Sequence, residues 1–116
     1  MQAHSAGAAE LLGDRELVDA VCSDYTTAPL AAPEKALFAF LAKVNDRCHE
    51  VAERDIDALH SEGWTDEAIY DAFTVCSLFN FYNRWVDAFG GQPISAAEQR
   101  LTGRRLAARG YIVRQE

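Results

Sequence analysis

The 116-residue sequence has no apolar run close to the roughly 20 residues that a membrane-spanning helix needs. Its first residues do not combine a basic region with a following apolar stretch, as a secretory signal would. Proline is also scarce, with only three residues, which leaves long segments open to helix formation. We therefore expect no membrane segment, and we expect the protein to be cytoplasmic.

Positive charge is in short supply as well. Eleven Lys and Arg residues face 18 Asp and Glu residues, which gives a formal net charge of −7. An acidic surface repels phosphate backbones, and only the C-terminal segment "RLTGRRLAARGYIVR" is basic. We expect no nucleic-acid partner.

Cysteine is too sparse for a disulfide framework. The three residues Cys22, Cys48 and Cys76 are an odd number at wide spacing, and the sequence has no Cys-x-x-Cys pair. Cys48 and His49 with His60 could be drawn as a partial metal site, but no paired ligands recur at the usual spacing. We expect reduced thiols, no metal and no cofactor, with Cys22 and Cys76 serving as small apolar residues.

What is present points to helices. The sequence is 49% hydrophobic, and apolar residues recur at helical spacing between local start and stop signals. Asp14, Thr65 and the Ser95-x-x-Glu98 capping box are the expected helix starts. The pattern predicts an all-α domain over 1–116, N-terminally incomplete and with 92–116 as a C-terminal helical extension. It has five to six helices, expected at 4–12, 15–24, 33–44, 52–63, 66–89 and 96–110.

The second half of the longest helix carries Asn80, Asn83, Arg84 and Asp87. These side chains could form a polar network beside a pocket, or they could brace neighbouring helices, which we favour because none of them is a nucleophile. Arg84 can pair with Asp87 at three residues' spacing. Aromatic residues lie on several sides of the same helix, so we expect a homo-oligomer, a dimer or larger.

Two segments carry a resemblance to a known family. They are "FNFYNRWVDAFG" at 79–90 and "DIDALHSEGWTDEAI" at 55–69. From about residue 1 to 91, the chain resembles the peroxidase-related branch of the alkylhydroperoxidase D-like, or carboxymuconolactone decarboxylase-like, family. The resemblance implies an AhpD-like helical bundle that forms oligomers. It also implies thiol-dependent reduction of hydroperoxides with a thiol reductant as partner.

The resemblance assigns a role to His4. The family's active site has a Cys-x-x-Cys pair at a helix N-terminus, a His four residues beyond the second Cys, and a Glu on a preceding helix. His4 matches that His only if a Cys stands directly before Met1, and the sequence contains neither redox Cys. We therefore expect this chain by itself to lack peroxidase activity. We expect the upstream codons, if native, to encode Cys-x-x-Cys ending directly before Met1.

The sequence leaves three alternatives open. Cys48, flanked by Arg47 and His49, is a possible reactive thiol. The chain could instead be a non-catalytic helical module that oligomerises or binds a partner. A decarboxylase acting on a muconolactone is the weakest alternative, because "NFYNR" favours the peroxidase-related branch.

Overall fold

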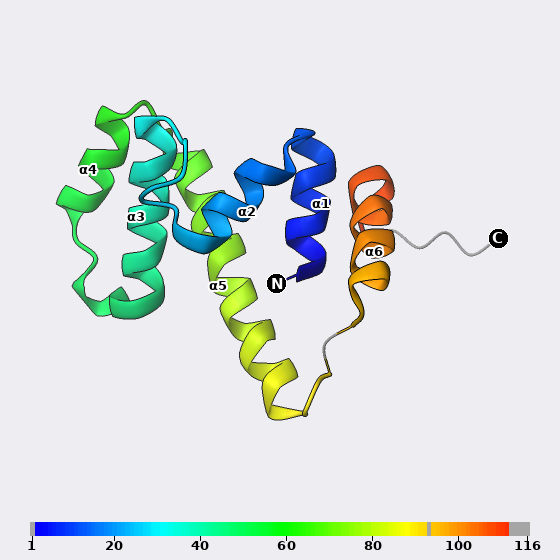
Figure 1. Ribbon diagram of the computed structural model, residues 1–116. Coiled ribbons are helices and arrows are strands. Elements are labelled where there is room, and N and C mark those ends of the chain that lie inside the picture. The colour runs from blue at the N-terminus through cyan, green and yellow to red at the C-terminus, as the bar shows by residue number, and fades with distance from the viewer. Residues whose placement is uncertain (1, 93, 112–116) are drawn as a thin grey trace. The chain divides into compact units, whose positions relative to one another are not determined.

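The computed structural model describes residues 2–92 and 94–111, and these residues form helices and connections without a strand. The described residues contain six α-helices: α1 (Gln2–Leu12), α2 (Arg15–Asp24), α3 (Ala32–Arg47), α4 (Glu53–Ser61), α5 (Asp66–Ala88) and α6 (Ala96–Arg109) (Figure 1). A short 3₁₀ turn, η1 (Cys48–Glu50), follows α3. The all-α prediction with five to six helices is confirmed. None of the described helices has the length and apolar character needed to cross a bilayer.

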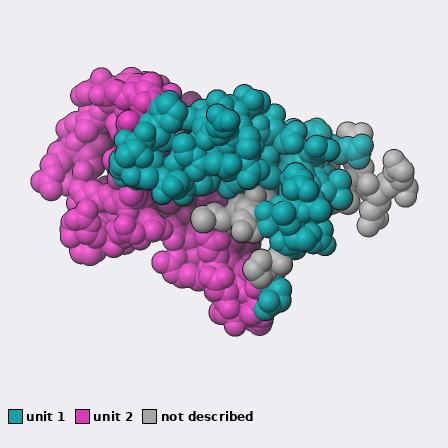
Figure 2. Space-filling model, in the orientation of Figure 1, with its two compact units in different colours: residues 1–29, 92–116 teal, residues 30–91 magenta. Residues whose placement is uncertain are grey.

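The chain divides into two compact units, which Figure 2 shows in different colours. Unit 1 comprises residues 1–29 and 92–116, and it contains α1, α2 and α6. Unit 2 comprises residues 30–91, and it contains α3, η1, α4 and α5. The C-terminal helix α6 therefore belongs to the same unit as the first two helices of the chain, and it packs against α1.

Unit 1 is built on a close contact between α1 and α6, which run side by side in Figure 1. Small residues make this approach possible, because Ala6, Gly7 and Gly103 are all buried. A Cβ atom on Gly103 would lie 2.6 Å from the Cβ of Ala6 and 2.8 Å from the backbone of Ala6 and Gly7. Position 103 therefore requires glycine for the two backbones to come this close.

Unit 2 has a small apolar core. Leu59 of α4 is the most buried large side chain, at 1% exposure, and it lies in a cluster with Phe40, Val44 and Ile69. These residues come from α3, α4 and α5, so burying them holds the three helices together. The indole Nε1–H of Trp64 donates to the carbonyl of Pro33 over 2.9 Å and fixes the start of α3 beside the turn between α4 and α5.

One ion pair links α3 to the start of α4. Lys43 Nζ lies 2.8 and 2.7 Å from the two carboxylate oxygens of Asp55, and both side chains are about four-fifths buried. Asp55 also accepts a hydrogen bond from the backbone N–H of Ala52 over 2.8 Å. This contact satisfies the backbone N–H of Ala52, the residue just before α4, whose methyl side chain cannot cap the helix.

The boundaries agree with the local signals except at one connection. Asp14, Thr65 and Ser95 accept hydrogen bonds from the backbone N–H groups of Leu17, Ala68 and Glu98, as expected for N-caps. The connection expected at residues 45–51 is wrong in its first half, because α3 continues to Arg47 and η1 follows directly. No Pro or Gly interrupts this stretch, and a cationic Arg47 suits the negative end of the helix dipole.

Candidate functional site

His4 lies in the first half of α1 and contacts a residue from the other end of the chain. Its Nε2 atom is 2.5 Å from the phenolic oxygen of Tyr111, a residue just beyond α6. The centroids of the two rings are 6.1 Å apart. The structure therefore gives the candidate histidine a hydrogen-bond partner within unit 1.

His4 and Tyr111 line a pocket of about 230 Å³. It lies between α1 and α6, and its remaining lining residues are small or aliphatic: Gly7, Ala8, Leu11, Leu106 and Ala107. Partial burial lowers the pKa of His4 below its ordinary value of 6.5. The imidazole is therefore mainly neutral at pH 7, which is the form that can accept a proton.

The four polar residues of α5 do not all come together. Arg84 Nη1 donates to the side-chain oxygen of Asn80 over 2.7 Å and to its backbone carbonyl over 3.0 Å. Asn80 in turn donates to the carbonyl of Cys76 over 3.2 Å. Within residues 2–92 and 94–111, no ion pair joins Arg84 to Asp87, and no side-chain hydrogen bond joins Asn83 to this group. The contacts lie along one helix of unit 2 and hold Arg84 against it.

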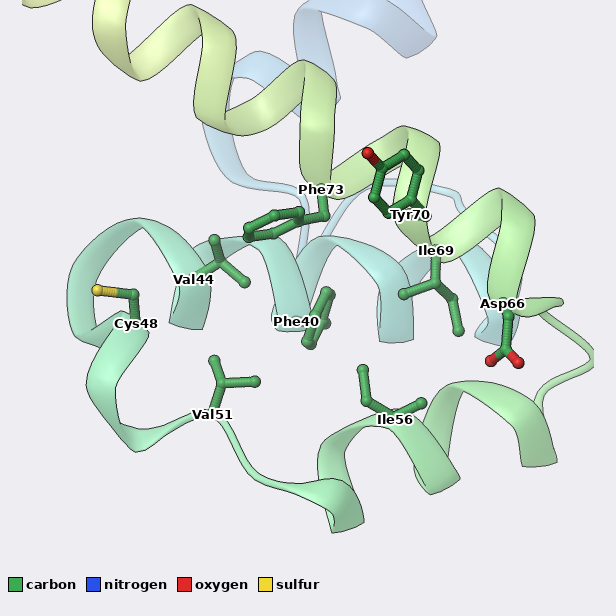
Figure 3. A pocket seen from close by; sticks show the side chains of 9 residues that line it. All are labelled: Phe40, Val44, Cys48, Val51, Ile56, Asp66, Ile69, Tyr70 and Phe73. Atoms are coloured by element: carbon green, nitrogen blue, oxygen red, sulfur yellow. The ribbon is translucent and has the colours of Figure 1, made fainter.

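Cys48 lines a second and larger pocket, of about 480 Å³, in unit 2 (Figure 3). The walls are mainly apolar and comprise Phe40, Val44, Val51, Ile56, Ile69, Tyr70 and Phe73. Cys48 and Asp66 lie at opposite ends of the pocket in this view. The pocket provides space for an apolar group and places no cationic side chain among its lining residues.

The two basic residues that flank Cys48 in the sequence both contact the same carboxylate. Arg47 Nη1 lies 3.4 Å from a carboxylate oxygen of Glu50, and His49 Nε2 lies 3.8 Å from the other. Both basic neighbours are therefore directed toward Glu50. Cys48 itself is exposed.

The other two cysteines, Cys22 and Cys76, differ in how exposed they are. Cys22, expected on an apolar stripe, is exposed, and its sulfur lies 3.5 Å from the hydroxyl of Ser5. Burial raises the pKa of the Cys76 thiol, which keeps the sulfur protonated and unreactive at neutral pH.

His60, a residue of the partial metal site considered above, lies 2.7 Å from Asp66. The described part of the chain holds no cluster of three or more His, Cys, Asp or Glu residues able to bind a metal.

Neither a protein-family model nor a curated protein matches this sequence. A solved structure does: the crystal structure of an alkylhydroperoxidase AhpD core, an uncharacterized peroxidase-related protein from Ralstonia eutropha JMP134. The TM-score is 0.70 and the sequence identity is 27%, over 88% of this chain. The chain has the AhpD-like fold.

The AhpD-like chain described here spans 60% of the length of that protein. The expectation drawn from "FNFYNRWVDAFG" and "DIDALHSEGWTDEAI" is thus confirmed for the fold. Tyr111 is a polar residue of the His4 pocket that the sequence did not indicate. It is 107 positions from its partner, and no local pattern connects the two.

Proposed function

We propose that this chain is part of a peroxidase-related AhpD-like protein, in which His4 is the general base for a redox-active thiol. The likeness to the peroxidase-related AhpD core over 88% of the chain is the observation that supports this most. The neutral imidazole in a small pocket on α1 agrees with it, because a thiol becomes a nucleophile only after losing its proton.

The chemistry requires two neighbouring thiols. One thiolate attacks an oxygen of the hydroperoxide, which forms a sulfenic acid and releases the other oxygen as an alcohol after it takes up a proton. The second thiol then condenses with the sulfenic acid to give a disulfide and water, and a dithiol reductant restores both thiols. The proposal assigns His4 the first proton transfer.

The printed sequence has no Cys-x-x-Cys pair to carry out this cycle. Cys22 belongs to unit 1, whereas Cys48 and Cys76 belong to unit 2. We therefore expect the 116-residue chain to consume no hydroperoxide with dithiothreitol as reductant. Turnover that is lost in Cys48→Ser would contradict this expectation and would make Cys48 the nucleophile.

The direct test extends the chain. A segment that ends in Cys-x-x-Cys directly before Met1 places the second thiol four residues from His4, which is about one helical turn. We expect this extended protein to reduce an organic hydroperoxide with dithiothreitol. The matched control carries Ser-x-x-Ser in the same segment and should be inactive. An extended protein that folds but stays inactive would refute the proposed function.

The second candidate function is that of an oligomerisation module, and one observation favours it. Large apolar side chains recur along α5 and its C-terminal end at alternating spacings of three and four residues: Val75, Leu78, Tyr82, Trp85 and Phe89. Each is between 48% and 76% exposed. This spacing is typical of a helix–helix seam, and we propose that these five residues, the α5 seam, pack against a second copy of the chain.

Sedimentation of the whole chain tests this second proposal. The wild type should sediment at micromolar concentration as a dimer or larger, and Leu78→Lys should shift it toward the monomer. Asn83→Lys is the matched control, because it adds the same charge to an exposed position of α5 outside the seam. A wild-type monomer, or equal dissociation by both substitutions, would contradict the α5 seam as the interface.

A further inference from the structure

We propose that Tyr111 is a positioning residue, which orients the His4 imidazole by accepting a hydrogen bond from its Nε2–H. The inference deepens the proposed function of His4 and rests on it for its catalytic meaning. It concerns a residue beyond positions 1–91, where the sequence itself resembles the family, and the C-terminal helix brings this residue to the site.

The helix pair places the phenol where it can act. Gly103 lets α6 lie against Ala6 and Gly7 of α1, at distances that exclude any side chain on residue 103. At the end of α6, Gly110 has a φ of +60° and its N–H donates to the carbonyl of Leu106 over 2.9 Å. This left-handed residue ends the helix, and Tyr111 follows directly with its hydroxyl at Nε2 of His4.

The hydrogen bond has a chemical consequence for the ring. When Nε2–H donates to the phenolic oxygen, a neutral imidazole has its lone pair on Nδ1. Nδ1 is then the atom that takes the proton from a thiol. The resulting imidazolium keeps its Nε2–H bond to Tyr111, so the orienting contact is present before and after the transfer. The proton later passes from Nδ1 to the alkoxide released from the hydroperoxide, which becomes the alcohol.

The proposal predicts a spectroscopic signature that is independent of activity. Tyr111→Phe keeps the ring and removes only the hydroxyl, which takes no part in the contacts of Gly103 with Ala6 and Gly7. The ¹⁵N shifts of the imidazoles are measured in the 116-residue chain at a pH where all three histidines are neutral. His4 should show mainly the Nε2–H tautomer in the wild type and a mixture of tautomers in Tyr111→Phe.

His49 and His60 provide internal controls, since their rings contact the carboxylates of Glu50 and Asp66 and not Tyr111. Their signals should not change in Tyr111→Phe, and a His4→Gln variant assigns the remaining signal. Equal His4 shifts with and without the hydroxyl would overturn the proposal. So would a wild-type His4 that is mainly the Nδ1–H tautomer.

A second measurement separates this inference from the proposed function. In the Cys-x-x-Cys-extended protein, Tyr111→Phe should lower kcat about tenfold and leave KM unchanged, as expected for loss of one orienting hydrogen bond. An unchanged kcat would contradict the catalytic meaning of the contact. If the extended wild type is inactive, the proposed function fails, whereas the ¹⁵N shifts still decide whether Tyr111 orients His4.

Discussion

Replacing Gly103 with alanine should weaken the contact between α1 and α6. The new Cβ would lie 2.6 Å from the Cβ of Ala6 and 2.8 Å from the backbone of Ala6 and Gly7, where ordinary contacts begin at 3.4 Å. Two of the three nearest atoms belong to the backbone, so no rotation of a side chain relieves the overlap. The helices must move apart by roughly 1 Å, which reduces their dispersion contacts.

The expected size follows from two opposing effects. Overpacking of this kind costs about 1–3 kcal/mol. Alanine is favoured over glycine by about 1 kcal/mol in a helix interior. Gly103→Ala should therefore destabilise the protein by about 1 kcal/mol. Gly7→Ala is the matched control on the facing helix, because its Cβ would lie 3.6 Å from the nearest atom, an ordinary contact. It should stabilise the protein by up to about 1 kcal/mol.

Urea unfolding followed by helical circular dichroism measures both effects. The midpoints should fall in the order Gly7→Ala, wild type, Gly103→Ala, from most to least stable. The Gly103→Ala protein should also lose the His4 tautomer preference, because Tyr111 depends on the position of α6. A Gly103→Ala protein as stable as Gly7→Ala would show that the close contact of α1 and α6 is not present in solution.

Three further predictions concern single side chains. Leu59→Ala removes the most buried large side chain of unit 2 and should cost about 2–5 kcal/mol in urea unfolding, whereas a cost under 1 kcal/mol would contradict the described core. The bond from Lys43 holds the pKa of Asp55 below its ordinary 3.8, so the stability advantage of the wild type over Asp55→Asn should be full above about pH 5 and shrink as pH falls through that lowered pKa. An advantage that does not vary with pH would refute the pair. Ser95→Ala removes the cap whose hydroxyl accepts from Glu98 N–H and should cost about 1 kcal/mol, measurable as a lower midpoint.

The features that could be predicted from the sequence are those set by neighbouring residues. The capping hydrogen bonds of Asp14, Thr65 and Ser95 join residues three positions apart, so these residue types predict the helix starts. The connection at 45–51 was misplaced because polar residues such as Asn45 and Asp46 tolerate either helix or loop. Burial of Val44 just before them continues the helix, and this depends on packing in three dimensions.

In the candidate site too, features set by neighbouring residues could be predicted, and features set by packing in three dimensions could not. The position of His4 on a helix with small neighbours could be predicted from the first residues alone. Its contact with Tyr111 could not, because it joins residues 107 positions apart through the packing of α6 on α1. The pairing of Arg84 was also uncertain from spacing, since Asn80 and Asp87 both lie within one helical turn of it. In the structure, Arg84 donates a hydrogen bond to Asn80.

The most direct test of the central claim is the dependence of peroxide reduction on His4. Consumption of an organic hydroperoxide is measured in the Cys-x-x-Cys-extended protein with dithiothreitol, at equal concentrations of wild type and His4→Ala. Because a lost general base typically costs about 10²–10⁴-fold, we expect a decrease of that size in His4→Ala, with both proteins equally helical by circular dichroism. Equal rates of peroxide consumption in the two proteins would contradict it.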